Sequence, residues 1–104
     1  SLFYYENGNL EAKYCLKNGQ FDGIQEMFYE NGNLKIQGYF QDNESAGNLY
    51  IFRENGLLWY KIIIDKEEKV EAFDKSGKSL GYLSNKEEEQ KIMGKLKTMF
   101  IHKY

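Results

Sequence analysis

The hexapeptide Tyr5-Glu6-Asn7-Gly8-Asn9-Leu10 occurs in three copies at a fixed interval. The second copy is Tyr29-Glu30-Asn31-Gly32-Asn33-Leu34, and the third is Arg53-Glu54-Asn55-Gly56-Leu57-Leu58. The three glycines lie at positions 8, 32 and 56, so the period is 24 residues. A degraded fourth copy begins at Phe73-Asp74-Lys75-Ser76-Gly77, only 21 residues after Phe52. A period of this length is typical of proteins built from stacked supersecondary units.

Each copy predicts one β-hairpin. An Asn-Gly pair between apolar segments favours a tight turn, and the segments after it alternate polar and apolar residues as half-buried strands do. Polar loops are predicted at residues 17–23 and 41–47, each closed by a glycine. The predicted strands are Leu2–Tyr5, 10–17, Ile24–Tyr29, 34–40, Asn48–Arg53, 58–64, Val70–Phe73 and Ser79–Leu83. Because short loops join them and no crossover helix intervenes, the sequence predicts a mainly β fold, an antiparallel meander of these strands.

Two registers fit the Asn-Gly turns. A two-residue type I′ turn would place Tyr5 opposite Leu10, whereas a type I turn with a glycine bulge would place Tyr4 opposite Leu10. The second register is preferred, because it brings the aromatic residue before each turn onto the face of the repeated leucines. The turns need positive φ, which glycine adopts without strain. The glycines with this structural role are Gly8, Gly32 and Gly56.

The C-terminal part of the chain has no Asn-Gly turn and no period of two. It predicts one amphipathic helix of about five turns, with Ser84 or Asn85 as its cap. The apolar stripe of this helix consists of Ile92, Met93, Leu96, Met99 and Phe100. We expect it to pack on the outer face of the third and fourth hairpins. That face carries Trp59, Ile63, Leu80 and Tyr82. Residues 1–83 then form the hairpin array and residues 84–104 its capping helix, in one structural domain.

The composition excludes several classes of protein. Fourteen Lys and Arg residues against 16 Asp and Glu residues give a net charge of -2, so no basic surface for nucleic acid is expected. A single cysteine excludes a disulfide within the chain, and one cysteine with one histidine cannot form a zinc site. No apolar run approaches the roughly 20 residues of a membrane-spanning helix, so a soluble protein is expected.

No residue is predicted to be catalytic or to bind a cofactor or a metal ion. Phosphoryl transfer needs a phosphate-binding loop, yet neither G-x-x-x-x-G-K-[ST] nor G-x-G-x-x-G occurs. Nucleophilic catalysis needs a base beside the nucleophile. The single histidine, His102, lies at the end of the predicted helix, and Cys15 stands alone in a strand. The sequence therefore predicts a protein that is not an enzyme and has no cofactor.

Aromatic residues are the positive functional signal. They make up 16% of the chain, and one helix cannot cover both faces of a single-layer sheet, so some rings are expected at the surface. Tyr and Trp dominate binding hot spots because their rings are large and stiff and carry one polar group. The alternative is that the rings only stiffen a thin sheet. The candidate binding residues are Tyr14, Tyr39, Tyr50, Trp59 and Tyr60.

The hexapeptide with the loop Lys17-Asn18-Gly19-Gln20-Phe21-Asp22-Gly23 resembles the bacterial variant of the MORN repeat, seen in antitoxins of the YwqK type. The resemblance covers residues 2–83 and is best over residues 4–58, although Asn43 replaces the loop glycine in the second copy. It implies a twisted array of antiparallel β-hairpin repeats and a role in binding or scaffolding, without catalytic residues. MORN repeats also accompany plant phosphatidylinositol phosphate kinases, but a lipid-kinase label would be wrong for a chain without a nucleotide site.

Two functions are compatible with these features. The first is a non-enzymatic module that binds a protein partner, antitoxin-like or as a scaffold. The second is a peripheral membrane protein whose last helix lies on anionic phospholipid through its lysines. These lysines are Lys91, Lys95, Lys97 and Lys103. Self-association through the edge strand Leu2–Tyr5 is a further expectation. Because the chain opens at Ser1 in mid-hairpin, upstream repeats or a signal peptide are expected to be missing, and no compartment is predicted.

Overall fold

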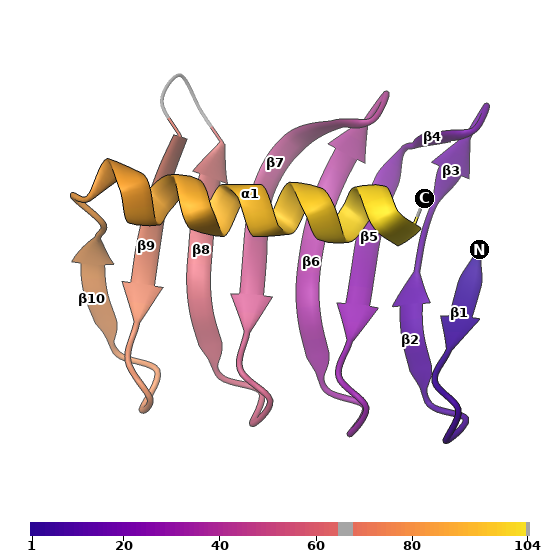
Figure 1. Cartoon of the computed structure of the whole chain (residues 1–104), viewed down its shortest axis with the longest axis horizontal. Helices are drawn as coiled ribbons and strands as arrows, with labels where there is room; N and C mark the ends of the chain where they lie inside the picture. The colour runs from indigo at the N-terminus through magenta and orange to yellow at the C-terminus, as the bar shows by residue number, and fades with distance from the viewer. Residues whose placement is uncertain (65–67, 104) are drawn as a thin grey trace.

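The computed structural model describes residues 1–64 and 68–103, and the side chains of residues 1–64 and 68–96. Within these residues the chain forms a single-layer, eight-stranded antiparallel sheet, a two-stranded hairpin and one helix (Figure 1). The sheet contains, in spatial order, β1 (Leu2–Tyr4), β2 (Leu10–Lys13), β5 (Gly23–Phe28), β6 (Leu34–Gln41), β7 (Glu44–Phe52), β8 (Leu58–Ile64), β9 (Glu68–Phe73) and β10 (Ser79–Tyr82). The small hairpin consists of β3 (Leu16–Lys17) and β4 (Gln20–Phe21), and the helix α1 spans Lys86–Lys103. Spatial order follows chain order, so the predicted meander with one C-terminal helix is confirmed.

The Asn-Gly turns adopt the preferred form, a tight turn followed by a glycine bulge. Gly8 has a φ of 91°, and its N–H donates to the carbonyl of Tyr5 at 3.0 Å. The same bond and a positive φ recur at the other two copies of the hexapeptide. Tyr4 pairs with Leu10, which confirms the second of the two registers. Positive φ falls on the glycine alone, so no type I′ turn forms there.

A second bulge, three residues after the glycine of the third turn, changes which residues share a face. In the third hairpin Ile51 pairs with Tyr60, but Phe52 pairs with Leu58, so Trp59 is the extra residue. The ring of Trp59 stacks on the ring of Tyr60 at 5.4 Å between centroids. Strict alternation from Leu58 onwards would have placed these two rings on opposite faces. The period-two pattern predicted for this strand is therefore interrupted at its first residues.

Replacing Gly32 by Val should lower the free energy of unfolding by about 1–3 kcal/mol, because valine is strained at a φ of +93°. A Cβ atom at this position would meet nothing within 4 Å, so the loss reports backbone strain alone. The matched control is Gly94→Ala in α1, where φ is not positive and no atom outside the helix backbone is near. Urea denaturation should show the control unchanged or more stable by up to about 1 kcal/mol. An unchanged midpoint for Gly32→Val would contradict this account of the turn.

The polar loop predicted at residues 41–47 is much shorter than expected. Asp42 and Asn43, with φ of 52° and 68°, make a two-residue turn from β6 into β7. β7 therefore begins at Glu44, and Gly47 lies inside the strand instead of closing a loop. The prediction was wrong because Asp and Asn both tolerate positive φ, so two residues suffice to reverse the chain.

The loop predicted at residues 17–23 likewise contains strand residues. Asn18 and Gly19, with φ of 53° and 76°, form a two-residue turn that joins β3 to β4. This small hairpin is attached to the β6–β7 turn, because Asn43 bonds Phe21 twice. The Asn43 side chain accepts the Phe21 N–H at 2.6 Å, and the Asn43 N–H donates to the Phe21 carbonyl at 3.0 Å.

The helix begins at one of the two predicted caps. Asn85 Oδ1 accepts the backbone N–H groups of Glu87 at 2.9 Å and of Glu88 at 3.3 Å, so Asn85 rather than Ser84 is the cap. From there α1 crosses the strands on one side of the sheet, from β10 towards β2 (Figure 1). It lies nearer the β6–β7 turn than the Asn-Gly turns, so it covers only part of that side.

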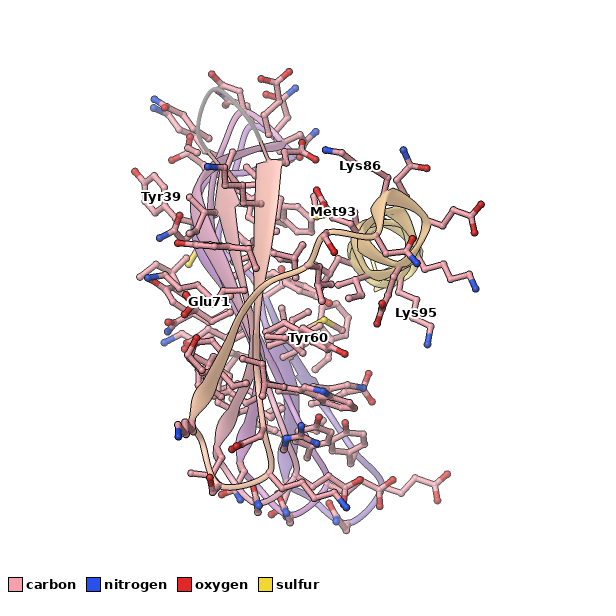
Figure 2. All side chains as sticks on the ribbon, turned by 90° about the vertical axis from the view of Figure 1, so that its left-hand side faces the viewer. Tyr39, Tyr60, Glu71, Lys86, Met93 and Lys95 are labelled. Carbon is pink, nitrogen blue, oxygen red and sulfur yellow. The ribbon has the colours of Figure 1, made fainter. Side chains whose placement is uncertain are left out.

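The two sides of the sheet are therefore unequal (Figure 2). We call the side under α1, which carries Tyr60, the helix face, and the opposite side, which carries Tyr39 and Glu71, the open face. The hydrophobic core lies between α1 and the helix face. Its buried members are Ala12, Tyr14, Phe21, Met27, Ile36, Phe40, Leu49, Ile62, Val70, Met93 and Leu96.

The face predicted for helix packing was wrong. Met93 and Leu96 are buried on the helix face, whereas Leu80 and Tyr82 remain largely exposed. At 1.5 Å per residue an 18-residue helix is about 27 Å long and crosses roughly six strands. An apolar surface must therefore continue across the whole array, and only the helix face provides one. Ile92, also predicted to pack, is half-buried against this core, whereas Met99 and Phe100 lie outside the described side chains.

Candidate functional site: the surfaces of the sheet

The repeated hexapeptide joins successive hairpins. The Tyr5 hydroxyl donates to the carbonyl of Phe28 at 2.5 Å. The next copy makes the same bond from Tyr29 to Phe52 at 2.6 Å. Arg53 takes this position in the third copy, and its guanidinium donates to the following hairpin at 3.1 Å. The first residue of the motif is therefore a long side chain with a hydrogen-bond donor, a role that both Tyr and Arg can fill.

The asparagines of the hexapeptide make a second set of links. Asn7 and Asn9 both donate to the carbonyl of Glu30 in the next turn, at 3.3 and 2.6 Å. The second copy repeats both bonds onto Glu54. The third copy has Leu57 in the second position, which has no donor on its side chain. The residues that define the repeat are thus explained by the cohesion of the array, without a ligand.

Tyr14, a candidate binding residue, lies in the core. It is only 3% exposed, and its ring contacts Phe3 and Phe21 at centroid distances of 5.6 and 5.3 Å. The row of rings continues from Phe21 to Phe40 at 5.6 Å. This row closes the end of the core beside the small hairpin. In the described structure Tyr14 therefore contributes packing and offers almost no surface to a partner.

Burial raises the pKa of Tyr14 from 10.0 to about 12, with a smaller contribution from the Glu11 carboxylate. In the unfolded chain Tyr14 ionises near pH 10, whereas in the folded protein it stays neutral up to about pH 12. The stability that comes from burying the neutral hydroxyl is therefore fully present below pH 10 and is lost as the pH rises to about 12. We expect Tyr14→Phe to weaken the fall of the unfolding free energy over this range. Urea denaturation at each pH measures it, with the exposed Tyr39→Phe as the control. Equal slopes for wild type and Tyr14→Phe would contradict the burial of the hydroxyl.

A stack of three side chains lies on the part of the helix face that α1 leaves uncovered. The Trp59 ring lies between the ring of Tyr60, at 5.4 Å, and the guanidinium of Arg53, at 4.5 Å from its centroid. Tyr60 also packs against the core, which anchors the stack. A cation over an indole ring at this distance is a favourable contact. Trp59 is still 37% exposed, so it stays a candidate for binding, while Tyr60 supports it.

The open face carries the most accessible of the candidate residues. Tyr39 is 47% exposed and pairs across strands with Ile24, which is 49% exposed. Tyr50 is half-buried and pairs with Gln37 and Lys61. Figure 2 shows Tyr39 directed away from α1, with no element of the described structure above it. Tyr39 and Tyr50 therefore lie on one surface, separate from Trp59.

The open face carries two pairs of opposite charges, and two uncharged positions lie between them. Lys13 pairs with Glu26, and Lys61 pairs with Glu71. Between these two pairs Gln37 donates to the Glu26 carboxylate at 3.0 Å. Neighbouring opposite charges stabilise the strand pairs and leave the face without one dominant sign. Such a face suits a partner that carries both signs of charge.

Sequence reasoning missed Ile24 and Arg53 as parts of these surfaces. Ile24 was assigned to a strand, but its exposure follows from the register with β6, which period-two patterns alone do not give. Arg53 stands where the first two copies of the motif have Tyr5 and Tyr29, and this difference in the sequence could have indicated a distinct role for Arg53. A change of residue at a structural position of a repeat indicates either decay or a new contact, and here it makes the stack with Trp59.

Among the side chains of residues 1–64 and 68–96, no group of three or more His, Cys, Asp or Glu lies close enough to hold a metal ion. The backbone of Cys15 is bonded to the Gln25 side chain. The side chain of His102 lies outside the described residues. Over the same residues, no helix is long and apolar enough to cross a membrane.

The comparison with protein families agrees with this architecture. Residues 1–18 and 21–42 match the model of the MORN repeat variant, which covers the first two hairpins of the sheet. Searches of the curated proteins and of the solved structures gave no match. The matched segments contain the hexapeptide, its bulged turn and the residues that bond the next hairpin. The match supports a MORN-repeat protein.

Proposed function

We propose that this protein is a non-enzymatic module that binds a protein partner, and that the open face is its binding surface. The observation that carries the proposal is the inequality of the two faces: α1 packs on one, while the other presents the exposed pair Ile24 and Tyr39. Exposed apolar side chains within a polar surround are typical of interaction sites. Tyrosine is also enriched among the residues that dominate binding energy.

The size and charge of this face favour a protein as the partner. The two longer dimensions of the molecule are 36 and 30 Å, so the face exceeds the roughly 800 Å² that each partner buries in a standard interface. It carries two pairs of opposite charges, Lys13 with Glu26 and Lys61 with Glu71, on either side of uncharged positions. A polyanion such as nucleic acid needs clustered positive charge, so we propose no nucleic-acid partner.

The test starts from proteins captured with the wild-type chain and measures affinity for the one recovered. Ile24→Ser with Tyr39→Ser should weaken binding at least about 10-fold, or about 1.4 kcal/mol. Lys91→Ala, on the exposed side of α1, is the control and should bind as wild type does. Loss of binding in Trp59→Ala with full binding in the open-face variant would move the site to the helix face. Failure to recover any partner would contradict the proposal.

An antitoxin role is the more specific form of this proposal. In that case the partner is a toxin, and coexpression of the chain should relieve the growth arrest that the toxin causes. The open-face variant should fail to relieve it. We further propose that the chain neither hydrolyses ATP nor phosphorylates lipids. Turnover that survives repurification and disappears in a point variant would contradict this.

The alternative of peripheral membrane binding has less support. Lys91 and Lys95 are exposed on α1, as a membrane-binding helix requires, but Met93 and Leu96 are buried against the sheet. Insertion into lipid would have to expose this core first. Lys97 and Lys103 lie outside the described side chains. We expect the protein to stay in the supernatant when anionic phosphatidylserine vesicles are sedimented.

A further inference from the structure

One row of side chains crosses the open face, with one residue from each of β2, β5, β6, β7, β8 and β9. Each member of the row pairs directly with the next one across the sheet. Residues paired in this way point to the same side, so the whole row lies on the side of Glu71, away from α1 (Figure 2). In spatial order the row is Lys13, Glu26, Gln37, Tyr50, Lys61 and Glu71.

The charges of this row invert about its centre, which falls between β6 and β7. The two uncharged residues lie at the centre. Outward from them, Glu26 on one side corresponds to Lys61 on the other, and Lys13 then corresponds to Glu71. Every charge therefore has an opposite charge at the matching position across the centre. All four residues lie on internal strands, so β1 and β10 do not enter this pattern.

Such a row is complementary to a second copy of itself. In a face-to-face pair with a two-fold axis parallel to the strands, the row of one copy lies reversed over the row of the other. Glu26 then faces Lys61 of the second copy, and Lys13 faces its Glu71, each twice by symmetry. Every charge gains an opposite charge across the interface besides the one beside it in its own sheet. A two-fold axis parallel to the row would instead stack each residue on its own copy, so like charges would meet.

Apolar residues nearer the β6–β7 turn have the same symmetry. Ile24 precedes Glu26 by two residues in β5, and Ile63 follows Lys61 by two residues in β8. Because β5 and β8 run in opposite directions, both isoleucines are displaced from the charged row towards the same end of the sheet. The two-fold axis that matches the charges therefore also places Ile24 over Ile63 of the second copy. Tyr39 pairs with Ile24 and extends this apolar contact.

The dimensions of the face suit a stable dimer. They reach 36 and 30 Å, which is enough for the roughly 800 Å² that each partner buries in a standard interface. Aligned sheets pack about 10 Å apart and about 30° from parallel, and long lysine and glutamate side chains span the resulting offsets. Burial of the apolar residues would drive association, while the charges would fix its orientation.

We propose that the open face is a self-complementary dimer interface, with the two copies related by a two-fold axis parallel to the strands. This inference rests on the proposed function, because it names a second copy of the chain as the partner of the same surface. A two-fold contact is closed, so the assembly stops at the dimer.

Charge reversal tests the contact between Glu26 and Lys61. Sedimentation velocity should show wild type as a dimer that does not grow further as its concentration rises. Glu26→Lys and Lys61→Glu should each raise the dissociation constant of the dimer at least about 100-fold, about 10-fold for each of the two symmetric contacts. Lys95→Glu, on the exposed side of α1, is the matched control and should dimerise as wild type does.

An equimolar mixture of the two reversed variants should restore the dimer. In the mixed dimer the two reversed positions face each other, and so do the two unchanged ones, so opposite charges meet at both contacts. Its dissociation constant should lie within about 10-fold of wild type. Thermal melting checks the fold of each variant. If either one is unfolded, the separate variants Lys13→Glu and Glu71→Lys repeat the test at the outer contact.

Other outcomes would overturn the inference. Wild type that stays monomeric at millimolar concentration excludes the dimer. Reversed variants that dimerise as well as wild type, or that do not recover on mixing, exclude this orientation of the two copies. If wild type is monomeric but Ile24→Ser with Tyr39→Ser abolishes binding of a captured protein, the second copy is refuted as the partner and the proposed function stands. If the captured protein stays bound to that variant, the open face itself is refuted.

Discussion

Leu96→Ala should lower the free energy of unfolding by about 2–5 kcal/mol, because Leu96 is one of two buried contacts of α1 in the described core. A domain of this size has a total stability of about 5–15 kcal/mol, so the loss is a large share of it. The residue is 3% exposed and packs with the central strands of the helix face. Urea denaturation followed by the fluorescence of Trp59 measures the change.

The neighbouring Lys95→Ala is the matched control, since this side chain is exposed on the same helical turn. It should change stability by less than about 0.5 kcal/mol. Equal midpoints for Leu96→Ala and Lys95→Ala would mean that α1 does not contribute to the folded core. That result would favour the membrane role of the helix, and vesicle sedimentation would then be the deciding measurement.

Gln25→Leu is expected to cost about 1–3 kcal/mol, although it places an apolar residue in a buried position. The Gln25 side chain is fully buried and forms a pair of bonds with the backbone of Cys15, accepting its N–H and donating to its carbonyl, both at 2.8 Å. Cys15 lies in the gap between β2 and β3, where no neighbouring strand pairs with it. Leucine would remove the acceptor of the Cys15 N–H, which costs about 1–3 kcal/mol. The Cys15 carbonyl would keep the bond that it accepts from the Asp22 N–H at 3.0 Å.

Gln37→Leu is the control for this substitution. Gln37 is half-buried on the open face and bonds only the Glu26 side chain among the contacts described. Its replacement should cost less than about 1 kcal/mol. If Gln25→Leu proved as mild as Gln37→Leu, the amide would not be holding the strand end at Cys15. Hydrogen exchange of the Cys15 N–H provides a second measure, because loss of its acceptor should speed exchange.

The sequence alone predicted the strands because the information needed is local. A bulged turn depends on Gly8 and its nearest neighbours, and it sets the pairing of Tyr4 with Leu10 without reference to the rest of the chain. Repetition of that unit every 24 residues then leads to a meander, since short connections leave no other topology. The errors in loop length, at Asp42 and Asn43, came from overlooking how few residues these side chains need for a turn.

The candidate binding residues could be named from the sequence but not assigned to a surface. Tyr14 and Tyr39 are the same residue type in adjacent hairpins, yet one is buried beside Phe21 and the other lies open beside Ile24. The two stand one position apart in the repeat, since Tyr14 is in phase with Gly38, so period two places them on opposite faces. Which of these faces α1 covers could not be read from the strands. The contact between Arg53 and Trp59 could not be predicted from the sequence either. The two residues are six positions apart along the chain and meet only after the turn has formed.

The amino-acid sequence by itself determined the hairpin repeat, the antiparallel order of the strands and the C-terminal helix, because these depend on contacts within about one period. It left two registers open, and the structure has the one that pairs Tyr4 with Leu10. Only the tertiary structure decided which face α1 covers, and so which aromatic rings remain exposed. That choice depends on the sum of apolar surface over all eight strands, from Ala12 to Val70. Hydrophobic packing is non-directional and additive over area, so no single repeat could reveal it.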